Sequence, residues 1–204
     1  MKPDVKHQPV APTSDDLLGQ EAIKQSVRQA YREIIGRGAT DEAVRRLYDP
    51  GQLALLPPGA TAQALGVGNP VRAAGLRPGE VVIDLGCGGG IDTILAAYAV
   101  GPAGKAIGLD LLPEMLEVAS RHAAEAGVAN VEWLQGEMEA IPLPDESVDV
   151  VVSNGAINLS PRKSRVFAEI YRILRPGGRF AAADNFIDDD LPPEILTNPA
   201  AWAG

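Results

Sequence analysis

The sequence contains a single cysteine, Cys87, and its 18 lysines and arginines are outnumbered by 27 aspartates and glutamates. One cysteine excludes an internal disulfide framework and a cysteine-rich metal site, and we expect no bound metal. A net charge of -9 repels phosphate backbones and anionic lipids, so neither nucleic acid nor membrane is an expected partner. No apolar run approaches the ~20 residues that span a bilayer, and the polar N-terminus is unlike a secretory signal. A cytoplasmic protein is therefore expected.

Size and composition predict one globular unit. The chain has 204 residues, 46% of them hydrophobic, which suffices for one core but not for two. Residues 1–15 are polar, contain prolines and show no periodicity, so we expect a flexible tail. Residues 16–70 are expected to form an N-terminal helical cap, with helices at 16–35 and 41–47 before a long loop with short helical pieces. Residues 71–204 are expected to form the main core.

From Gly79 onward, short apolar segments alternate with amphipathic or apolar helical ones. The expected strands are 81–85, 105–110, 131–135, 147–153 and 179–184, and the expected helices are 91–100, 113–126 and 164–174. Such alternation predicts an α/β fold with a mostly parallel sheet, helices on both faces and right-handed crossovers. Ligands of such sheets bind at the carboxyl ends of the strands.

A glycine-rich segment from Asp84 to Gly90 joins the first expected strand to the following helix. Glycines permit positive φ and let a ligand approach the backbone, and the helix N-terminus presents free N–H groups. The dinucleotide pattern G-x-G-x-x-G lacks its third glycine here, which disfavours an NAD-dependent oxidoreductase. The spacing that fits is acid-x-G-x-G-x-G, which resembles motif one of the class I methyltransferases. A glycine-rich turn without a ligand is the alternative.

Acidic residues follow the second and third expected strands. Asp110 ends the second, where a carboxylate can accept both ribose hydroxyls of an adenosyl group, with Leu111 beside it. By itself, Asp110 could also cap the helix that begins near Pro113. The resemblance to methyltransferases implies that Glu137 contacts the adenine amino group and that the Met138 backbone lies beside it. A solvated acidic loop is the alternative for this pair.

Several further segments carry recognisable motifs: Gly68-Asn69-Pro70, Asp84 to Ala97, Gly101-Pro102, Pro113 to Leu116, Ile157 to Pro161, Leu191 to Ile195 and Trp202-Ala203-Gly204. Together they resemble the bacterial arsenite methyltransferases, over about residue 48 to the C-terminus. The resemblance implies a Rossmann-like methyltransferase core that uses S-adenosyl-L-methionine on a small-molecule acceptor. The implied cofactor-binding residues are Tyr31, Asp84, Gly86, Cys87, Gly88, Gly90, Asp110, Leu111, Glu137, Met138 and Asn154. Asn154 and Asn158 are the candidates nearest the acceptor, with no catalytic residue assigned.

The chain departs from that family at the cysteines that hold trivalent arsenic. Gly155 and Val67 occupy two positions at which the family carries thiols, and Cys87 cannot form a thiolate site alone. The acceptor is therefore either a metalloid, as the resemblance implies, or a small organic molecule, as the missing thiols indicate. A truncated or degenerate cofactor-binding module without methyl-transfer activity is the alternative function.

The expected sheet is shorter than that of the family. Class I methyltransferases usually have seven strands, and we expect this chain to lack the last of them. The fifth strand would then be an edge with unpaired N–H and C=O groups. Either a helix over about 192–202 or a second copy of the chain is expected to cover it, so a homodimer is one of two expected outcomes.

Overall fold

A computed structural model describes residues 20–34, 41–62 and 64–185 of the chain. The expected tail over 1–15, the expected helix over 192–202 and the Trp202-Ala203-Gly204 segment lie outside the described residues. Within the described part, no helix is both long enough and apolar enough to cross a bilayer.

A single parallel sheet organises the described residues. Its strands are β1 (Val81–Leu85), β2 (Lys105–Asp110), β3 (Val131–Gln135), β4 (Val148–Asn154) and β5 (Leu174–Ala183). They lie in the order β3-β2-β1-β4-β5, and every neighbouring pair is parallel. The chain moves outward from β1 through β2 to β3 and then returns to β4 on the other side of β1. That reversal opens a crevice at the carboxyl ends of β1 and β4, where sheets of this type bind ligands.

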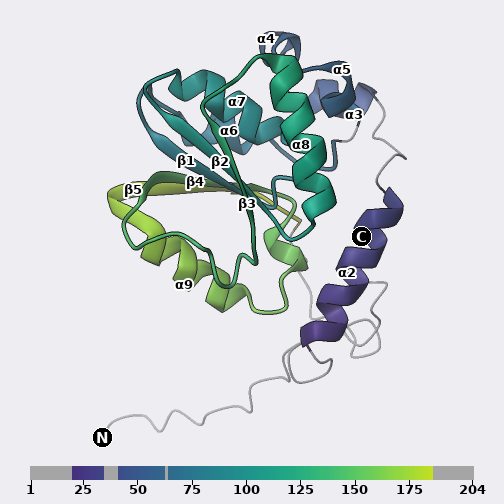
Figure 1. The fold of residues 1–204 in the computed structure, drawn as a ribbon, viewed down its shortest axis with the longest axis vertical. Coiled ribbons are helices and arrows are strands. Elements are labelled where there is room, and N and C mark those ends of the chain that lie inside the picture. Colours follow the sequence, from purple (N-terminus) through teal and green to yellow (C-terminus); the bar gives the residue numbers. More distant parts are fainter. Residues whose placement is uncertain (1–19, 35–40, 63, 186–204) are drawn as a thin grey trace, which may run out of the picture.

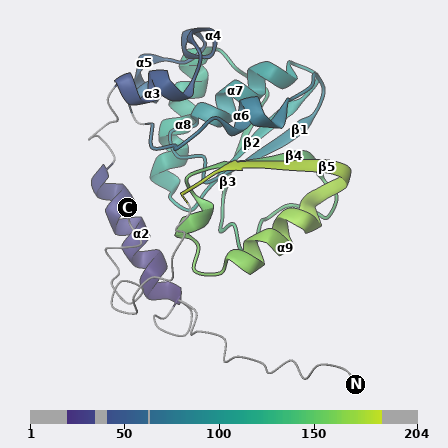
Figure 2. The ribbon, with the colours of Figure 1, turned by 180° about the vertical axis from the view of Figure 1, so that it is seen from behind.

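Helices cover both faces of the sheet, as predicted (Figures 1 and 2). One face carries α6 (Pro70–Ala74), α7 (Ile91–Val100) and α8 (Pro113–Ala126), and the other carries α9 (Lys163–Ile173), which follows the short 3-10 helix η1 (Ile157–Leu159). The N-terminal region contributes α2 (Gln20–Ile34), α3 (Asp41–Leu47), α4 (Pro50–Ala54) and α5 (Pro58–Thr61). Helix α2 stands apart from the others, beside the sheet (Figure 1).

The strands alternate their side chains between two apolar layers. Val82, Val150 and Val152 pack with the cluster that includes the alanines of α7. Ile83 and Val151 point to the opposite face, into the cluster that contains the apolar residues of α9. Because successive side chains of a strand alternate between faces, these runs of β-branched residues serve both layers.

Helix ends that are set by local proline and glycine residues agree with the prediction. Helix α8 starts with a proline, whose missing N–H costs nothing there, and ends at Gly127 in the left-handed conformation, φ 72°. The predicted loop after Tyr48 contains α4 and α5, as short helical pieces. Helix α4 begins with a capping box, in which Asp49 accepts a hydrogen bond from the Gln52 N–H.

The fifth strand begins earlier than predicted, at Leu174 rather than at Arg179. Leu174 pairs with Val148 and Arg179 pairs with Val150, so the residues between them bulge out of the ladder. Gly177 has φ 81° within this bulge. The residues Pro176-Gly177-Gly178, which favour a turn, therefore form an irregularity inside the strand and not a turn before it.

Candidate functional site

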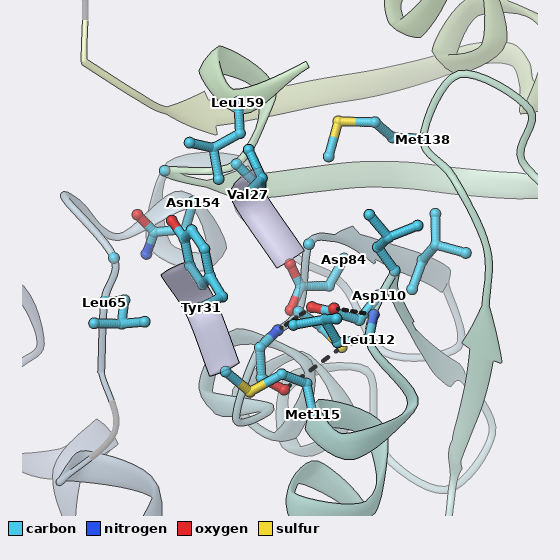
Figure 3. Close-up of a pocket in the computed structure, with 18 of the residues that line it drawn as sticks. Val27, Tyr31, Leu65, Asp84, Asp110, Leu112, Met115, Met138, Asn154 and Leu159 are labelled. Carbon is cyan, nitrogen blue, oxygen red and sulfur yellow. Dashed lines mark hydrogen bonds between the residues drawn. The ribbon is translucent and has the colours of Figure 1, made fainter. Parts of the chain in front are cut away.

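A pocket lies at the carboxyl ends of β1, β2 and β4, and α2 forms one of its walls. Figure 3 shows side chains from widely separated segments around it: Val27 and Tyr31 from α2, Leu65 from the loop before α6, and Asp84 and Asp110 from the sheet. Of the predicted site residues, ten line this pocket: Tyr31, Asp84, Gly86, Cys87, Gly88, Asp110, Leu111, Glu137, Met138 and Asn154. Gly90 and Asn158 are outside the lining.

The glycine loop has the backbone conformation that its sequence predicts. Gly86, Gly88 and Gly90 have φ values of 73°, 49° and 87°, in the left-handed region that side chains disfavour. A Cβ on Gly86 would also lie 2.3 Å from the Cβ of Ala156. A Cβ on Gly88 would meet no atom within 4 Å, because Gly88 faces the open pocket. Gly90 is instead the N-cap of α7 and packs against Ala119, so its part is to turn the chain into the helix.

Asp110 connects the end of β2 to the glycine loop. Its Oδ2 accepts a 2.9 Å hydrogen bond from the Gly88 N–H, and its Oδ1 accepts a 2.9 Å bond from the Leu112 N–H. Burial raises the pKa of Asp110, while these backbone bonds oppose the shift. Since a carboxylate has about four acceptor sites, these bonds leave acceptor capacity for a ligand. Asp110 thus bonds Leu112, the residue before α8, without capping the N–H groups of the helix itself, and it lines the pocket.

Asp84 is an internal residue of the site. It is 2% exposed, and its Oδ2 accepts a 2.7 Å hydrogen bond from Thr93 Oγ1 of α7. Burial, and then the nearby Asp92 carboxylate, raise the pKa of Asp84 well above its ordinary value. Its hydrogen bond ties the end of β1 to the first turn of α7 and so fixes the loop between them.

Glu137 is paired with α2. The Lys24 ammonium donates a hydrogen bond to Glu137 Oε2, and Arg28 Nη2 lies 3.9 Å from its Oε1. The carboxylate is therefore engaged by cations and is not a freely solvated loop residue. On the same helix, Tyr31 lines the pocket (Figure 3). Burial, and then the negative charges of Asp110 and Asp184, raise the pKa of Tyr31.

The two predicted acceptor-side asparagines have different surroundings. The Asn154 amide has hydrogen-bond partners on both its oxygen and its nitrogen, among them the N–H of Val67 at 2.8 Å. Asn158 has its backbone N–H bonded to Asp184 Oδ2 at 3.0 Å. A Cβ on Gly155 would lie 3.8 Å from Val67 Cγ1, so the two positions that the resemblance assigns to thiols are neighbours in space. Cys87 is a buried residue of the glycine loop, and burial raises the pKa of its thiol well above the ordinary value.

Two features of the site were not predicted. His122 is buried on α8 and its Nδ1 lies 2.8 Å from the Gly89 carbonyl oxygen, so it supports the glycine loop from behind. Asp92 is buried in α7 and bonded to Tyr48 and Asn154. A lone histidine on a helix carries no sequence signal of this contact. An aspartate in a mostly apolar helix does carry a signal: if the helix is buried, the carboxylate must have hydrogen-bond partners there.

This architecture, a β3-β2-β1-β4-β5 sheet with a glycine loop after β1 and an acid after β2, is that of a Rossmann-like class I methyltransferase core. Residues 76–204 match a family model described as a methyltransferase domain, and the chain belongs to that family.

Among curated relatives, the arsenite methyltransferase of Halobacterium salinarum is 45% identical over 157 residues, which cover 77% of this chain and 40% of that protein. The demethylmenaquinone methyltransferase of Lactococcus lactis is 42% identical over 109 residues, covering 53% and 43% of the two chains. A crystal structure of an arsenic(III) S-adenosylmethionine methyltransferase from Chlamydomonas reinhardtii superposes with a TM-score of 0.66 at 42% identity, over 75% of this chain and 52% of that one. The chain thus spans less than half the length of the curated relatives it matches.

Proposed function

We propose that this chain transfers a methyl group from S-adenosyl-L-methionine to a small molecule, as an arsenite methyltransferase-like enzyme. The observation that carries the proposal is the junction between Asp110 and Gly88. The carboxylate is held in place by the Gly88 N–H and keeps free acceptor sites beside the open pocket. That arrangement fits a ribose with two adjacent hydroxyl groups.

The pocket fits the cofactor on three further counts. The backbone at Gly88 leaves space that a side chain would fill. Leu111, Leu112 and Met115 offer an apolar wall for a flat ring, and Glu137 offers an acceptor for its amino group. Bound positive charge would favour the ionised forms of the lining acids Asp84, Asp92 and Asp110, because opposite charges attract strongly in a partly buried site.

The chain's own contribution to the reaction is placement. When bound, S-adenosylmethionine supplies an electrophilic methyl group on a positively charged sulfur. Holding two reactants in line removes much of their translational and rotational entropy before the reaction, so no dedicated base is required. Tyr31 and Val27 of α2 and Leu65 of the loop before α6 line the pocket (Figure 3), and their apolar surfaces would limit the access of water to the reactants.

The walls near the end of β4 favour an uncharged acceptor with an apolar body. Leu65, Leu159 and Pro161 line this part, and Gly155 leaves it without a side chain. Trivalent arsenic is the acceptor suggested by the relatives' names, but no thiol lies at Gly155 or Val67 to hold it. A small organic acceptor is supported by the 42% identity to a demethylmenaquinone methyltransferase. Within the described residues, no group of three histidine, cysteine or acidic side chains is placed to bind a metal ion.

Binding and turnover test the proposal separately. Isothermal titration with S-adenosylmethionine, S-adenosylhomocysteine and NAD should show binding of the first two alone. Radiolabelled S-adenosylmethionine is then incubated with a panel of arsenite plus glutathione, quinols, phenols and thiols. Label transferred to any acceptor supports the enzyme, whereas binding without transfer to any acceptor supports the silent binding module. NAD binding in place of S-adenosylmethionine would refute both. A cytoplasmic location remains part of the proposal.

A further inference from the structure

A single side chain, Asn154, joins three segments that are far apart in the sequence. Asn154 is the last residue of β4, and its Oδ1 accepts hydrogen bonds from the N–H groups of Val67 at 2.8 Å and Gly68 at 3.1 Å. Its Nδ2 lies 2.9 Å from the Gly68 carbonyl oxygen, 2.9 Å from Asp92 Oδ2 and 3.1 Å from Tyr48 Oη. The two N–H donors fix which end of the amide is oxygen, since only an oxygen can accept from them.

The segment over residues 66–68 passes very close to the sheet at this point. A Cβ on Gly66 would lie 2.3 Å from Asn154 Nδ2, and a Cβ on Gly68 would lie 2.4 Å from the Cβ of Ala183. The two glycines therefore let the main chain cross the carboxyl ends of β4 and β5 in contact with them. Leu65, directly before this segment, lines the pocket together with Gly66.

The other end of the Asn154 amide is anchored in the core. Asp92 is 6% exposed in the first turn of α7, and its carboxylate also accepts hydrogen bonds from Tyr48 Oη at 3.0 and 3.1 Å. Tyr48 is itself 4% exposed. Helix α7 begins directly after the glycine loop. The Asn154 amide therefore links the 66–68 segment to the first turn of α7, next to the predicted cofactor site.

We propose that Asn154 is a positioning residue that shapes the acceptor side of the pocket by holding residues 66–68, and with them Leu65, across the end of β4. The amide acts through the main chain that it binds, because its oxygen and nitrogen already have protein partners. This inference rests on the proposed function in naming that wall the acceptor side. The wall itself is a property of the fold and can be measured without any acceptor.

The test uses the full chain with Asn154→Ala, which removes the bridge, and Asn130→Ala as a matched control. Asn130 also bonds main-chain oxygens, those of Ala97 at 3.0 Å and Gly101 at 2.8 Å, but at the opposite end of α7. Hydrogen exchange followed by mass spectrometry should show the 64–68 amides exchanging at least about fivefold faster in Asn154→Ala, because two N–H groups lose their acceptor. The control should leave this segment unchanged.

A second readout separates positioning from general damage. The affinity for S-adenosylhomocysteine should change less than about threefold in Asn154→Ala, while the KM for whichever panel acceptor is methylated rises at least about tenfold. Equal losses in both affinities, or unchanged exchange over 64–68, would overturn the inference. If Asn154→Ala does not fold, Tyr48→Phe is the deciding variant, because it removes one hydrogen-bond partner of the Asn154 amide. It should raise the exchange rates over 64–68 to a smaller degree. No rise would refute the proposed role of Asn154. Failure of the wild type to bind S-adenosylhomocysteine counts against the proposed function and leaves the exchange test intact.

Discussion

Three carboxylates, those of Asp84, Asp92 and Asp110, lie buried or mostly buried around one glycine loop. Burying a charge is unfavourable unless hydrogen bonds compensate, and each of these side chains accepts one or more from neighbouring groups. Their pKa values are all raised, with burial as the largest cause. Buried acids with raised pKa values commonly gather at functional sites, and a positively charged ligand would lower these pKa values by attracting the ionised forms.

Asp110→Ala should weaken binding of S-adenosylhomocysteine by about 1.5–3 kcal/mol, the range for hydrogen bonds to a charged group. The substitution removes the predicted ribose acceptor and also frees the Gly88 N–H. Isothermal titration of both proteins measures the change, with Glu117→Gln on the exposed surface of α8 as a control. Equal affinities would remove Asp110 from the cofactor site.

Asp92→Asn tests a pH dependence. Burial raises the pKa of Asp92 from 3.8 to about 6. Because the folded state binds this proton more tightly than the unfolded state, ionisation of Asp92 reduces stability as pH rises from about 4 through about 6. The variant cannot ionise, so its free energy of unfolding relative to wild type should increase over that range, by roughly 2–3 kcal/mol at most. Urea denaturation at several pH values measures the difference, and a difference that does not vary with pH would contradict the assignment.

The chain should not methylate arsenite efficiently. Its one cysteine is buried within the glycine loop, where burial raises the thiol pKa and disfavours the thiolate that binds arsenic. Incubation with labelled cofactor, arsenite and glutathione, followed by chromatography, should give little methylated arsenic. Rates near ~1 per second, typical of enzymes, would show this to be wrong.

Gly155→Cys alone should not create arsenite activity in the same assay. One thiolate leaves a soft centre short of ligands. The φ of 71° at residue 155 also strains any side chain placed there. Adding Val67→Cys, whose side chain lies beside that position, is the matched comparison.

At the scale of the element, the strand-loop-helix unit β1–α7 determines the pocket floor. Gly86 and Gly88 share a left-handed backbone but differ in their surroundings. At Gly86 an added Cβ would collide with Ala156, whereas at Gly88, which lines the pocket, an added Cβ would meet no protein atom within 4 Å. The first glycine is therefore needed for folding, and the second is needed chiefly for the ligand.

Comparison of Gly86→Ala with Gly88→Ala separates these roles. Gly88→Ala should cost about 1–2 kcal/mol of stability from its backbone strain. Gly86→Ala should cost a further 1–3 kcal/mol, roughly, from the contact with Ala156. Only Gly88→Ala should fold well and yet lose affinity for S-adenosylhomocysteine. Denaturation and titration measure the two effects, and equal stabilities for the two variants would contradict the packing argument.

At the scale of the whole molecule, β5 forms one edge of the sheet in the part of the chain that the structure describes. Phe167 and Phe180 make an edge-to-face ring contact at 6.1 Å and remain 48% and 37% exposed, and Tyr171 nearby on α9 is 85% exposed. An open strand beside exposed aromatic side chains favours association.

The chain should therefore either dimerise along β5 or cover this edge with residues beyond 185. Sedimentation equilibrium measures the first outcome. Phe180→Lys should shift a dimer toward monomer, since a charged residue on an edge strand opposes pairing. A monomer whose β5 amides exchange as freely as exposed ones would contradict both alternatives.

The sequence by itself determined most helices and strands and the position of the cofactor-binding residues at the carboxyl ends of the strands. Helices that begin at a proline and end at a glycine, such as 113–126, and short apolar strands, such as 81–85, are set by local backbone preferences. The glycine loop and Asp110 could be placed because parallel strands bring their carboxyl ends to one edge. The β5 boundary was missed because a bulge reads locally as a turn.

Only the tertiary structure decided what the remaining polar residues do. Asn154 contacts Val67, 87 positions away, and Glu137 contacts Lys24, 113 positions away. His122 reaches the Gly89 carbonyl oxygen across 33 positions. No local pattern encodes such pairs, because each depends on how helices and loops pack after the sheet has formed. Local backbone preferences therefore determine the helices and strands of this protein. Long-range hydrogen bonds between buried polar groups determine the shape of its pocket.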